Sequence, residues 1–254
     1  MILDSFKLNG KVALITGAGQ GLGQGMSLAL AEAGANIIGL DRIASEATGE
    51  AVRALGRSYR QVVCDLCSAS MDELNRIVVE GVTEMGRLDI LVNNAGIIRR
   101  APALEFTEAD WDDVLQINLK AAFFLAQAAA RVMVPQGNGK IINIASMLSF
   151  QGGIIVPSYT AAKSGIVGVT RALANEWAKY NININAIAPG YMATDNTAAL
   201  RADATRSASI LDRIPAGRWG TPDDLKGVVV FLASAASNYM NGAVIPVDGG
   251  WLSR

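Results

Sequence analysis

Short apolar segments alternate with longer amphipathic segments along the whole chain. Seven segments are short and mostly apolar, and they span residues 11–16, 36–40, 61–64, 88–92, 140–144, 182–187 and 243–247. Stretches with helical periodicity separate most of them. Short apolar strands between amphipathic helices are typical of a parallel sheet that is covered on both faces. The pattern therefore predicts an α/β fold with a doubly wound, seven-stranded parallel sheet and right-handed crossovers.

The chain has 254 residues, about half of them apolar, which fits one large domain. No long linker, repeat or low-complexity stretch divides it, so we predict a single domain over residues 1–254. Residues 193–215 stand out because they are polar, rich in Ala and helical in pattern. They predict either a helical lid over the strand ends or a surface helical hairpin that does not move.

The charge and the apolar content of the chain limit the classes of function that it can have. The net charge of −1 argues against an electrostatic grip on nucleic acid. No apolar run reaches the ~18 residues that would indicate a membrane span. The first residues, MILDSFK, lack the basic region, apolar stretch and cleavage site of a secretion signal, so a cytoplasmic location is expected.

The absence of His excludes a Ser-His-Asp triad, a His-ligated zinc and an imidazole base. The only cysteines, Cys64 and Cys67, form a C-x-x-C pair without the further ligands that zinc needs, so no metal site is expected. A thioredoxin-like redox pair is an alternative. We favour the interpretation that Cys64 ends a buried strand and that Cys67 begins a loop.

A glycine-rich turn follows the first predicted strand and opens the first predicted helix, with the sequence TGAGQGLG over residues 16–23. Glycines in this context allow a tight turn and let the backbone approach a pyrophosphate. The helix N-terminus then offers N–H groups and a partial positive charge to the anion. The G-x-x-x-G-x-G spacing points to one subgroup of dinucleotide-binding folds.

Asp41 ends the second strand, where a carboxylate can accept both ribose hydroxyls of an adenosine and repel a 2′-phosphate. The alternative is that Asp41 only caps the next helix. Arg42 could pair with a 2′-phosphate, but the glycine-rich turn carries no Lys or Arg, so NAD is the expected cofactor. Asp65 is placed to meet the adenine amino group, and the small residues of 93–96 (NNAG) let the backbone pass close to the cofactor.

Tyr159 and Lys163 are four residues apart and share one face of a predicted helix. An adjacent ammonium favours the ionised phenol, and lowering a phenol pKa from about 10 to about 7 needs roughly 4 kcal/mol. Tyr159 could then act as an acid/base at neutral pH. Such a pair is also a common surface contact, but Ser146 upstream and the glycine-rich turn give it weight.

Together with Asn118 and Pro189-Gly190, these motifs resemble the short-chain dehydrogenase/reductase family over the whole chain. The resemblance implies a single-domain Rossmann fold, usually in a homotetramer. It implies that Tyr159 exchanges a proton with the substrate oxygen and that Ser146 hydrogen-bonds that oxygen. Lys163 would lower the tyrosine pKa and hold the nicotinamide ribose, and the Asn118 backbone would position a water that leads protons to the lysine.

The resemblance also implies which residues bind the cofactor. They are Gly17, Gln20, Gly21, Leu22, Asp41, Asp65, Leu66, Asn93, Ala95, Gly96, Tyr159, Lys163, Pro189, Gly190, Met192 and Thr194. The implied tetramer would form through the helix that carries Tyr159 and through the last strand, and we expect a partner to cover the apolar Trp251-Leu252.

Four segments, 96–100, 146–153, 189–197 and 218–222, resemble the sugar-acid branch of the family. Its members oxidise a secondary hydroxyl of a deoxyhexonate or reduce the corresponding ketone. Arg99 and Arg100 could clamp the carboxylate through two hydrogen bonds, or could be solvated loop charges. Other candidate substrate residues are Met147, which could be only a wall, and Gln151, Tyr191, Asn196 and Thr197.

Three other functions stay open. The first is oxidation of gluconate at its 5-position. The second is reduction of a 3-oxoacyl thioester, against which Asp41 counts because such reductases usually prefer NADPH. The third is a protein that senses the NAD/NADH ratio without turnover, against which the complete group of Ser146, Tyr159, Lys163 and Asn118 counts.

Overall fold

A computed structural model describes residues 1–254 and contains one parallel sheet of seven strands. The strands are β1 (Val12–Thr16), β2 (Asn36–Asp41), β3 (Tyr59–Val63), β4 (Ile90–Asn93), β5 (Gly139–Ile144), β6 (Ile182–Pro189) and β7 (Val244–Val247). Their spatial order is β3-β2-β1-β4-β5-β6-β7. Every strand lies within two residues of its predicted position, and the predicted fold class is confirmed.

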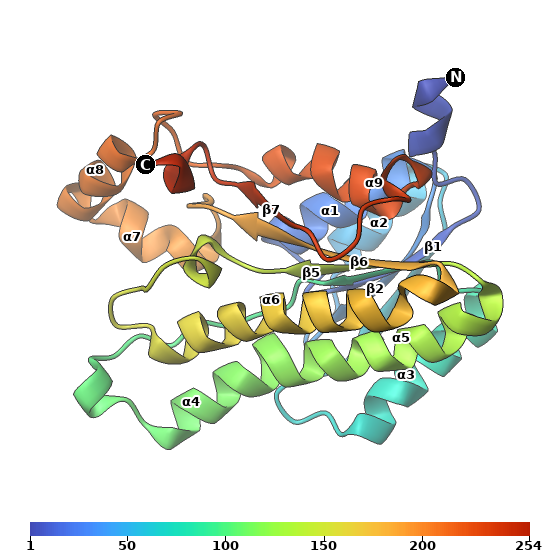
Figure 1. Cartoon of the computed structure of the whole chain (residues 1–254), viewed down its shortest axis with the longest axis horizontal. Coiled ribbons are helices and arrows are strands. Elements are labelled where there is room, and N and C mark those ends of the chain that lie inside the picture. Colours follow the sequence, from blue (N-terminus) through green and yellow to red (C-terminus); the bar gives the residue numbers. More distant parts are fainter.

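Helices cover both faces of this sheet (Figure 1). They are α1 (Gly21–Glu32), α2 (Glu46–Ala54), α3 (Met71–Met85), α4 (Glu108–Leu115), α5 (Ala122–Gln136), α6 (Pro157–Trp177), α7 (Ala198–Ala202), α8 (Ala204–Arg213) and α9 (Lys226–Ala233). Helices α1, α2 and α9 lie on one face, and α3 to α6 lie on the other. Each face has its own apolar core, one built mainly around α1 and α9 and one around α3 and α5. Burial on both faces explains why the central strands read as continuous apolar runs.

The strand near the cysteines differs from the prediction. β3 ends at Val63 and lies at the edge of the sheet, so its residues are only half-buried or exposed. Cys64 is buried directly after it, and both cysteines are free thiols. Cys67 lies in the following turn, where its thiol donates a hydrogen bond to the Asp113 carboxylate at 3.1 Å. The expectation of a buried strand was wrong because an edge strand has a neighbour on one side only.

A continuous helical stretch runs from α4 through a π-helical turn, Gln116–Ala121, into α5. By length and composition alone it could cross a membrane, but half of its most apolar window is buried inside the molecule. It packs against α3 and α6 below the sheet (Figure 1). π-Helical turns inside α-helices are frequent at functional sites.

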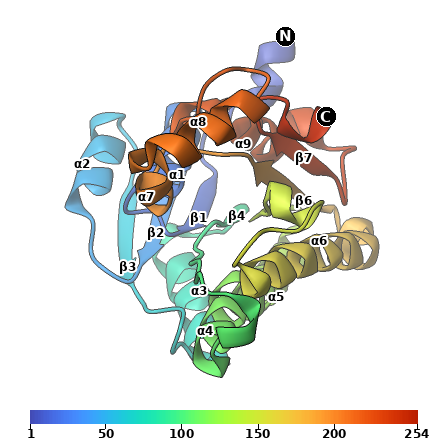
Figure 2. The same cartoon turned by 90° about the vertical axis from the view of Figure 1, so that its left-hand side faces the viewer.

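The strand order reverses between β1 and β4, which are neighbours although β2 and β3 intervene in sequence. In open α/β sheets, ligands bind in the crevice at the carboxyl ends of the strands beside this switch point. Helices α7 and α8 stand over that end of the sheet (Figure 2). The helical character predicted for residues 193–215 is therefore present, and whether the segment moves stays a prediction.

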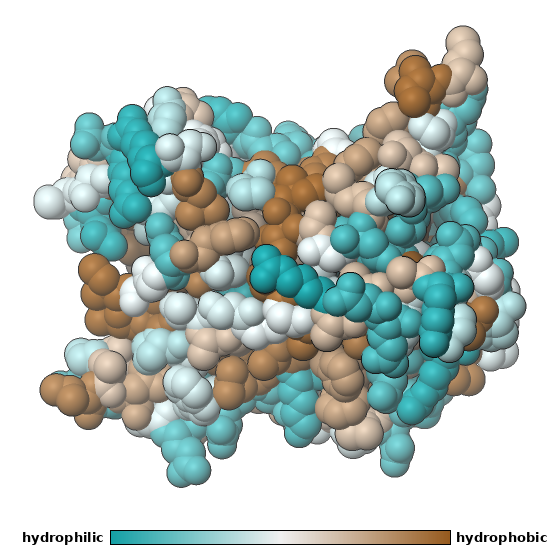
Figure 3. All heavy atoms as spheres, viewed as in Figure 1, coloured by the Kyte–Doolittle hydropathy of each residue, from teal (hydrophilic) through white to brown (hydrophobic).

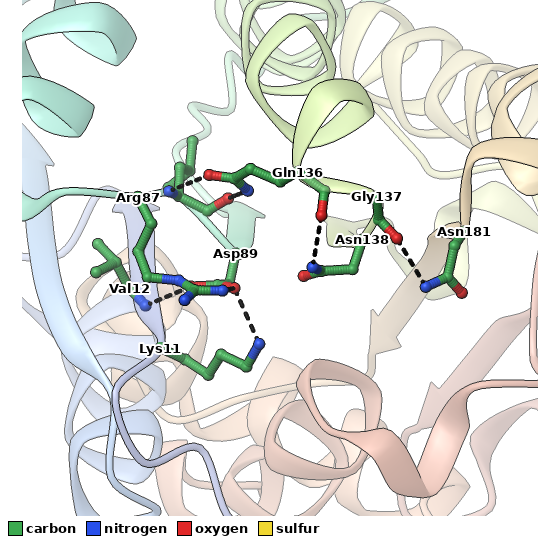
Figure 4. A network of polar contacts seen from close by, with 9 residues as sticks. Lys11, Val12, Arg87, Asp89, Gln136, Gly137, Asn138 and Asn181 are labelled. Atoms are coloured by element: carbon green, nitrogen blue, oxygen red, sulfur yellow. Dashed lines mark hydrogen bonds and ion pairs between the residues drawn. The ribbon is translucent and has the colours of Figure 1, made fainter.

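The amino ends of the strands carry a polar network instead (Figure 4). Asp89, which directly precedes β4, is 3% exposed and accepts four hydrogen bonds. Arg87 donates two of them at 2.7 Å each, Lys11 donates one at 3.0 Å, and the backbone N–H of Val12 donates one at 3.0 Å. Because Val12 belongs to β1, this carboxylate ties together the two strands at the switch point.

Candidate active site

A cleft of about 1150 Å³ opens at the carboxyl ends of the strands. Figure 3 shows the molecule hollowed at this end, between the α7–α8 pair and the helical layer opposite. The predicted site residues that line the cleft are Gly17, Gln20, Gly21, Leu22, Asp41, Asp65, Leu66, Ala95, Gly96, Arg99, Arg100, Ser146, Met147, Gln151, Tyr159, Lys163, Pro189, Gly190, Tyr191, Met192, Thr194, Asn196 and Thr197. Two predicted residues, Asn93 and Asn118, do not line it.

The glycine-rich turn connects β1 to the N-terminus of α1. Gly17 has a φ of +67°, and a Cβ on Gly23 would lie 1.9 Å from the Gly17 carbonyl oxygen, so a side chain at residue 23 would break the turn. No side chain caps the N-terminus of α1, and its first turn carries no acidic residue. The free N–H groups and the partial positive charge of this end fit the diphosphate of a dinucleotide.

Asp41 faces this turn across the mouth of the cleft. One carboxylate oxygen accepts the Gly19 N–H at 2.9 Å, and the other accepts the Arg42 N–H at 2.8 Å. Each oxygen keeps lone pairs for a ligand hydroxyl. The residue at the N-cap of α2 is Ser45, so Asp41 does not cap that helix. Arg42 is exposed and also lines the cleft.

The loop after β4 is fixed by the side chain of Asn94. Asn94 donates to the Thr16 carbonyl at 2.9 Å, and the Thr16 hydroxyl accepts the N–H groups of Asn94 and Ala95. Asn93 points into the core instead, where its amide donates to the Ala122 carbonyl at 3.0 Å. Successive side chains of a strand point to opposite faces, which separates these two asparagines.

Asn118 lies buried in the π-helical turn between α4 and α5. Its side chain accepts the Ile97 N–H at 2.9 Å and donates to the Ile97 carbonyl at 2.9 Å, so it holds the loop that follows β4. A Cβ on Gly96 would meet the Asn118 amide oxygen at 3.1 Å and the Lys163 ammonium at 3.7 Å. The absence of a side chain at Gly96 therefore lets Asn118 and Lys163 both approach the same point of the backbone.

Ser146 follows β5 and begins a short 3₁₀ turn, Met147–Ser149. Its hydroxyl oxygen accepts the Leu148 N–H at 3.1 Å, and its side chain also hydrogen-bonds to the Tyr159 phenol. The Ser149 hydroxyl accepts the Ser146 N–H at 3.2 Å and donates to the Lys163 carbonyl. This bridge fixes the serine turn to α6.

Lys163 is 4% exposed, and its ammonium lies 5.6 Å from the centre of the Tyr159 ring. It donates to the Ile144 carbonyl at 2.5 Å, and its other two hydrogens have no protein partner. Burial lowers the pKa of Lys163 to about 8. A buried ammonium with two free donors beside the cleft fits a ligand that carries adjacent hydroxyls, such as a ribose.

The pKa of Tyr159 shifts in the direction opposite to the expectation. Burial is the largest influence and raises it, while the Ser146 side chain and the Arg100 charge lower it. The ammonium of Lys163 is directed at the Ile144 carbonyl. In the protein alone, the positive influence on the phenol therefore comes from Arg100, which the sequence analysis assigned only to substrate.

The two arginines predicted as a joint carboxylate clamp have different surroundings. Arg99 forms ion pairs with Asp110 and Asp113, both at 3.1 Å. Arg100 donates to the Asn196 carbonyl at 3.3 Å and has no acidic partner. Arg100 is therefore available to a ligand, whereas Arg99 is held by two carboxylates of α4.

One wall of the cleft was not predicted from the sequence. Arg206, Ile210 and Arg213 of α8 line the cleft together with Trp251. The expectation that a partner covers Trp251 was wrong, because the ring is 4% exposed within this chain and packs in a small apolar cluster with Ile210. The only sequence signal for this wall was the helical pattern of residues 193–215, which does not show what α8 faces.

The fold and the cleft define a dinucleotide-binding oxidoreductase with a Ser-Tyr-Lys group, and comparison with known proteins gives its class. A family model described as enoyl-(acyl carrier protein) reductase matches residues 17–252. The chain belongs to the short-chain dehydrogenase/reductase family. It is 62% identical, over an alignment of 255 positions that covers 100% of both chains, to the 2-dehydro-3-deoxy-D-gluconate 5-dehydrogenase of Escherichia coli (strain K12).

Solved structures of similar proteins share the fold over the full chain. One, from Agrobacterium tumefaciens, is described as a 2-deoxy-D-gluconate 3-dehydrogenase with bound NADP; it is 52% identical, with a TM-score of 0.92, over 99% of this chain and 100% of that one. Another is a gluconate 5-dehydrogenase from Burkholderia cenocepacia J2315 in complex with NADP and tartrate. It is 41% identical, with a TM-score of 0.95, over 100% of both chains.

Proposed function

We propose that this protein is an NAD-dependent dehydrogenase of sugar acids that interconverts the 5-hydroxyl and the 5-ketone of a 2-dehydro-3-deoxyhexonate. The observation that carries the proposal is the 62% identity, over the full length of both chains, to an enzyme named for that reaction. The cleft supports it, because it holds Ser146, Tyr159 and Lys163 together with an unpaired guanidinium, that of Arg100. A similar solved structure is described as a 2-deoxy-D-gluconate 3-dehydrogenase, so the position of the reacting hydroxyl is the finer part of the proposal.

The residues of this chain supply the proton chemistry. In the oxidation direction, the Tyr159 phenolate removes the proton of the substrate hydroxyl, and the C–O bond becomes a C=O bond. A nicotinamide held in the cleft by the residues around Lys163 would supply the acceptor for the hydride of the same carbon. Ser146 can turn its hydroxyl hydrogen from the phenol to the substrate oxygen, because its own oxygen is already engaged by the Leu148 N–H.

The charges around the Tyr159 phenol set how easily it ionises to the phenolate, which is the form that acts as a base. Burial disfavours the phenolate, so the positive charge that favours it has to come from groups in the cleft. Arg100 supplies part of that charge. We propose that Lys163 anchors the nicotinamide ribose with its two free hydrogens and that the oxidised ring adds the remaining positive charge. The proton then leaves through a water molecule that the Asn118 backbone holds.

For the cofactor we propose NAD in preference to NADP. The support is the Asp41 carboxylate, which is fixed at the mouth of the cleft with lone pairs on both oxygens. The exposed Arg42 is the group that could reverse the preference by pairing with a 2′-phosphate. A kcat/KM that is higher with NADP than with NAD would contradict this part of the proposal.

A substrate screen tests the function directly. The purified protein is given each cofactor with 2-dehydro-3-deoxy-D-gluconate, 2-deoxy-D-gluconate, gluconate and a 3-oxoacyl thioester, each in the redox direction that its chemistry allows. Absorbance of the reduced nicotinamide reports turnover. The proposal predicts the highest kcat/KM for the 2-dehydro-3-deoxyhexonate. A preference for any other of these compounds would refute the substrate, and cofactor binding without turnover of any of them would indicate a sensor.

We also propose a homotetramer that forms through α6 and β7. The outward face of α6 carries small exposed residues, Ala161 and Gly168, and β7 has an open edge because it is the last strand of the sheet. A solution mass equal to one chain would refute this assembly. With a substrate bound, we propose that the helical segment 193–215 closes over the cleft.

A further inference from the structure

Arg213, the last residue of α8, is a charged side chain in the cleft that no acid neutralises. It lines the cleft and forms no ion pair with any carboxylate of the chain. Its guanidinium donates one hydrogen bond, at 3.4 Å, to the side-chain oxygen of Gln151 on the far side of the cleft mouth. A guanidinium has five N–H donors, so most of its hydrogen-bonding capacity is open to a ligand.

The Trp251 ring fixes the position of the Arg213 guanidinium. Its central carbon lies 4.1 Å from the centre of the Trp251 ring, which is the geometry of a stacked cation–π contact. Trp251 in turn packs edge-to-face against Tyr191, with ring centres 4.8 Å apart, and Tyr191 directly follows Pro189-Gly190 at the end of β6. The indole N–H of Trp251 is buried and has no hydrogen-bond partner, so aromatic and apolar contacts hold the ring. The Arg213 head group is thereby tied to the sheet that carries the cofactor loops.

The other arginines of the cleft are less suited to bind a distant carboxylate. Arg99 is committed to Asp110 and Asp113. Arg100 is held by the Asn196 carbonyl and stacks on no aromatic ring, and its charge already acts on the Tyr159 phenol. Arg206 is exposed on α8 and stacks on no aromatic ring. In a hexonate that reacts at C5, four carbon–carbon bonds separate the carboxylate from the reacting carbon, so the group that binds it has to lie away from Tyr159.

We propose that Arg213 binds the substrate carboxylate and is the residue that selects sugar acids over neutral sugars. This assignment rests on the proposed function and deepens it. The planar guanidinium offers two parallel donors to the two carboxylate oxygens, and stacking on Trp251 restricts its rotation, so little conformational freedom is lost on binding. Because α8 belongs to the segment 193–215, the same contact holds that segment against the bound acid.

The test compares Arg213→Ala with Arg206→Ala, which removes another exposed arginine that lines the cleft from the same helix but stacks on no aromatic ring. Each is assayed with the preferred sugar acid and with its carboxamide, which keeps the hydroxyls and removes the charge. Losing a charge-assisted bidentate contact should raise KM for the acid about 30-fold in Arg213→Ala. The kcat for the acid, the KM for the carboxamide and the KM for the cofactor should stay within threefold of wild type.

A conservative variant separates charge from geometry. Arg213→Lys keeps the positive charge but lacks the two parallel N–H donors of a guanidinium, so its KM for the acid should lie between those of wild type and Arg213→Ala. An acid KM within threefold of wild type in Arg213→Ala, or an equal rise in Arg206→Ala, would overturn the assignment while the proposed function stands. A wild-type protein that turns over none of the sugar acids would overturn the proposed function and the assignment with it.

Discussion

The carboxylate of Asp89 offers a test of stability that leaves the active site untouched. Asp89→Asn keeps the shape of the side chain and removes its charge. Each of its two carboxylate oxygens accepts two hydrogen bonds, so the group is surrounded by four N–H donors. The substituted amide can therefore accept from one pair of donors only, while its NH₂ faces the other pair.

The structure sets the size of the effect. The better orientation keeps the bonds from the Val12 N–H and from Nε of Arg87, and it loses those from Lys11 and from Nη2 of Arg87. Two charge-assisted bonds at about 1.5 kcal/mol each would give about 3 kcal/mol. The Lys11 and Arg87 side chains are 38% and 41% exposed and can turn to water, which reduces the expected loss to about 2 kcal/mol.

Urea titration of the cofactor-free protein, at the same protein concentration for each variant, measures this loss of unfolding free energy. Lys11→Met is the control and should cost less than about 1 kcal/mol, because it removes one partly exposed partner. The kcat of folded Asp89→Asn should match wild type, since the network lies at the opposite end of the strands from the cleft. A difference in unfolding free energy below about 0.5 kcal/mol would refute the reasoning.

The difference in unfolding free energy between wild type and Asp89→Asn should change with pH in a definite direction. Burial alone would raise the pKa of Asp89, but the donors from Arg87, Val12 and Lys11 outweigh it and hold the pKa below its usual value. A lowered pKa stabilises the fold above the unfolded value of about 3.9, and that stability disappears as pH falls further. The gap between wild type and Asp89→Asn should therefore narrow below about pH 4. A gap that widens on acidification would contradict the charge network.

Three further predictions concern the cleft. Asp41→Ala should lower the ratio of kcat/KM for NAD over NADP by at least about tenfold, because it removes both ribose acceptors and the repulsion of a 2′-phosphate; an unchanged ratio would exclude Asp41 from cofactor choice. The pKa of about 8 for Lys163 predicts that NAD binding, measured by calorimetry, weakens as pH rises through this value, and that Lys163→Met loses this dependence. Cofactor and sugar acid together should slow proteolysis within residues 193–215, and an unchanged cleavage rate would favour a rigid hairpin.

Features set by local pattern could be predicted from the sequence. The seven strands, the glycine-rich turn and the helix that carries Tyr159 and Lys163 all follow from apolar periodicity, glycine spacing and a separation of four residues. The same holds for the place of the cleft, because parallel strands bring their carboxyl ends to one edge of the sheet.

Features set by contacts distant in sequence could not be predicted. The ion pairs of Arg99 depend on α4, and the stack of Arg213 on Trp251 joins residues 38 positions apart. The inward turn of Asn93 depends on which face of β4 meets the core, and a one-residue change of register would exchange it with Asn94. The direction of the Tyr159 pKa shift depends on burial, which the spacing of Tyr and Lys does not reveal.

The central claim is that the phenol of Tyr159 carries the proton of the reacting hydroxyl. The most direct measurement is the kcat of Tyr159→Phe with the preferred sugar acid at saturating cofactor, beside the cofactor dissociation constant. Removing a general acid/base from its reacting atom should lower kcat by about 10³-fold or more, with cofactor binding within a few-fold of wild type. A kcat within tenfold of wild type would contradict the account.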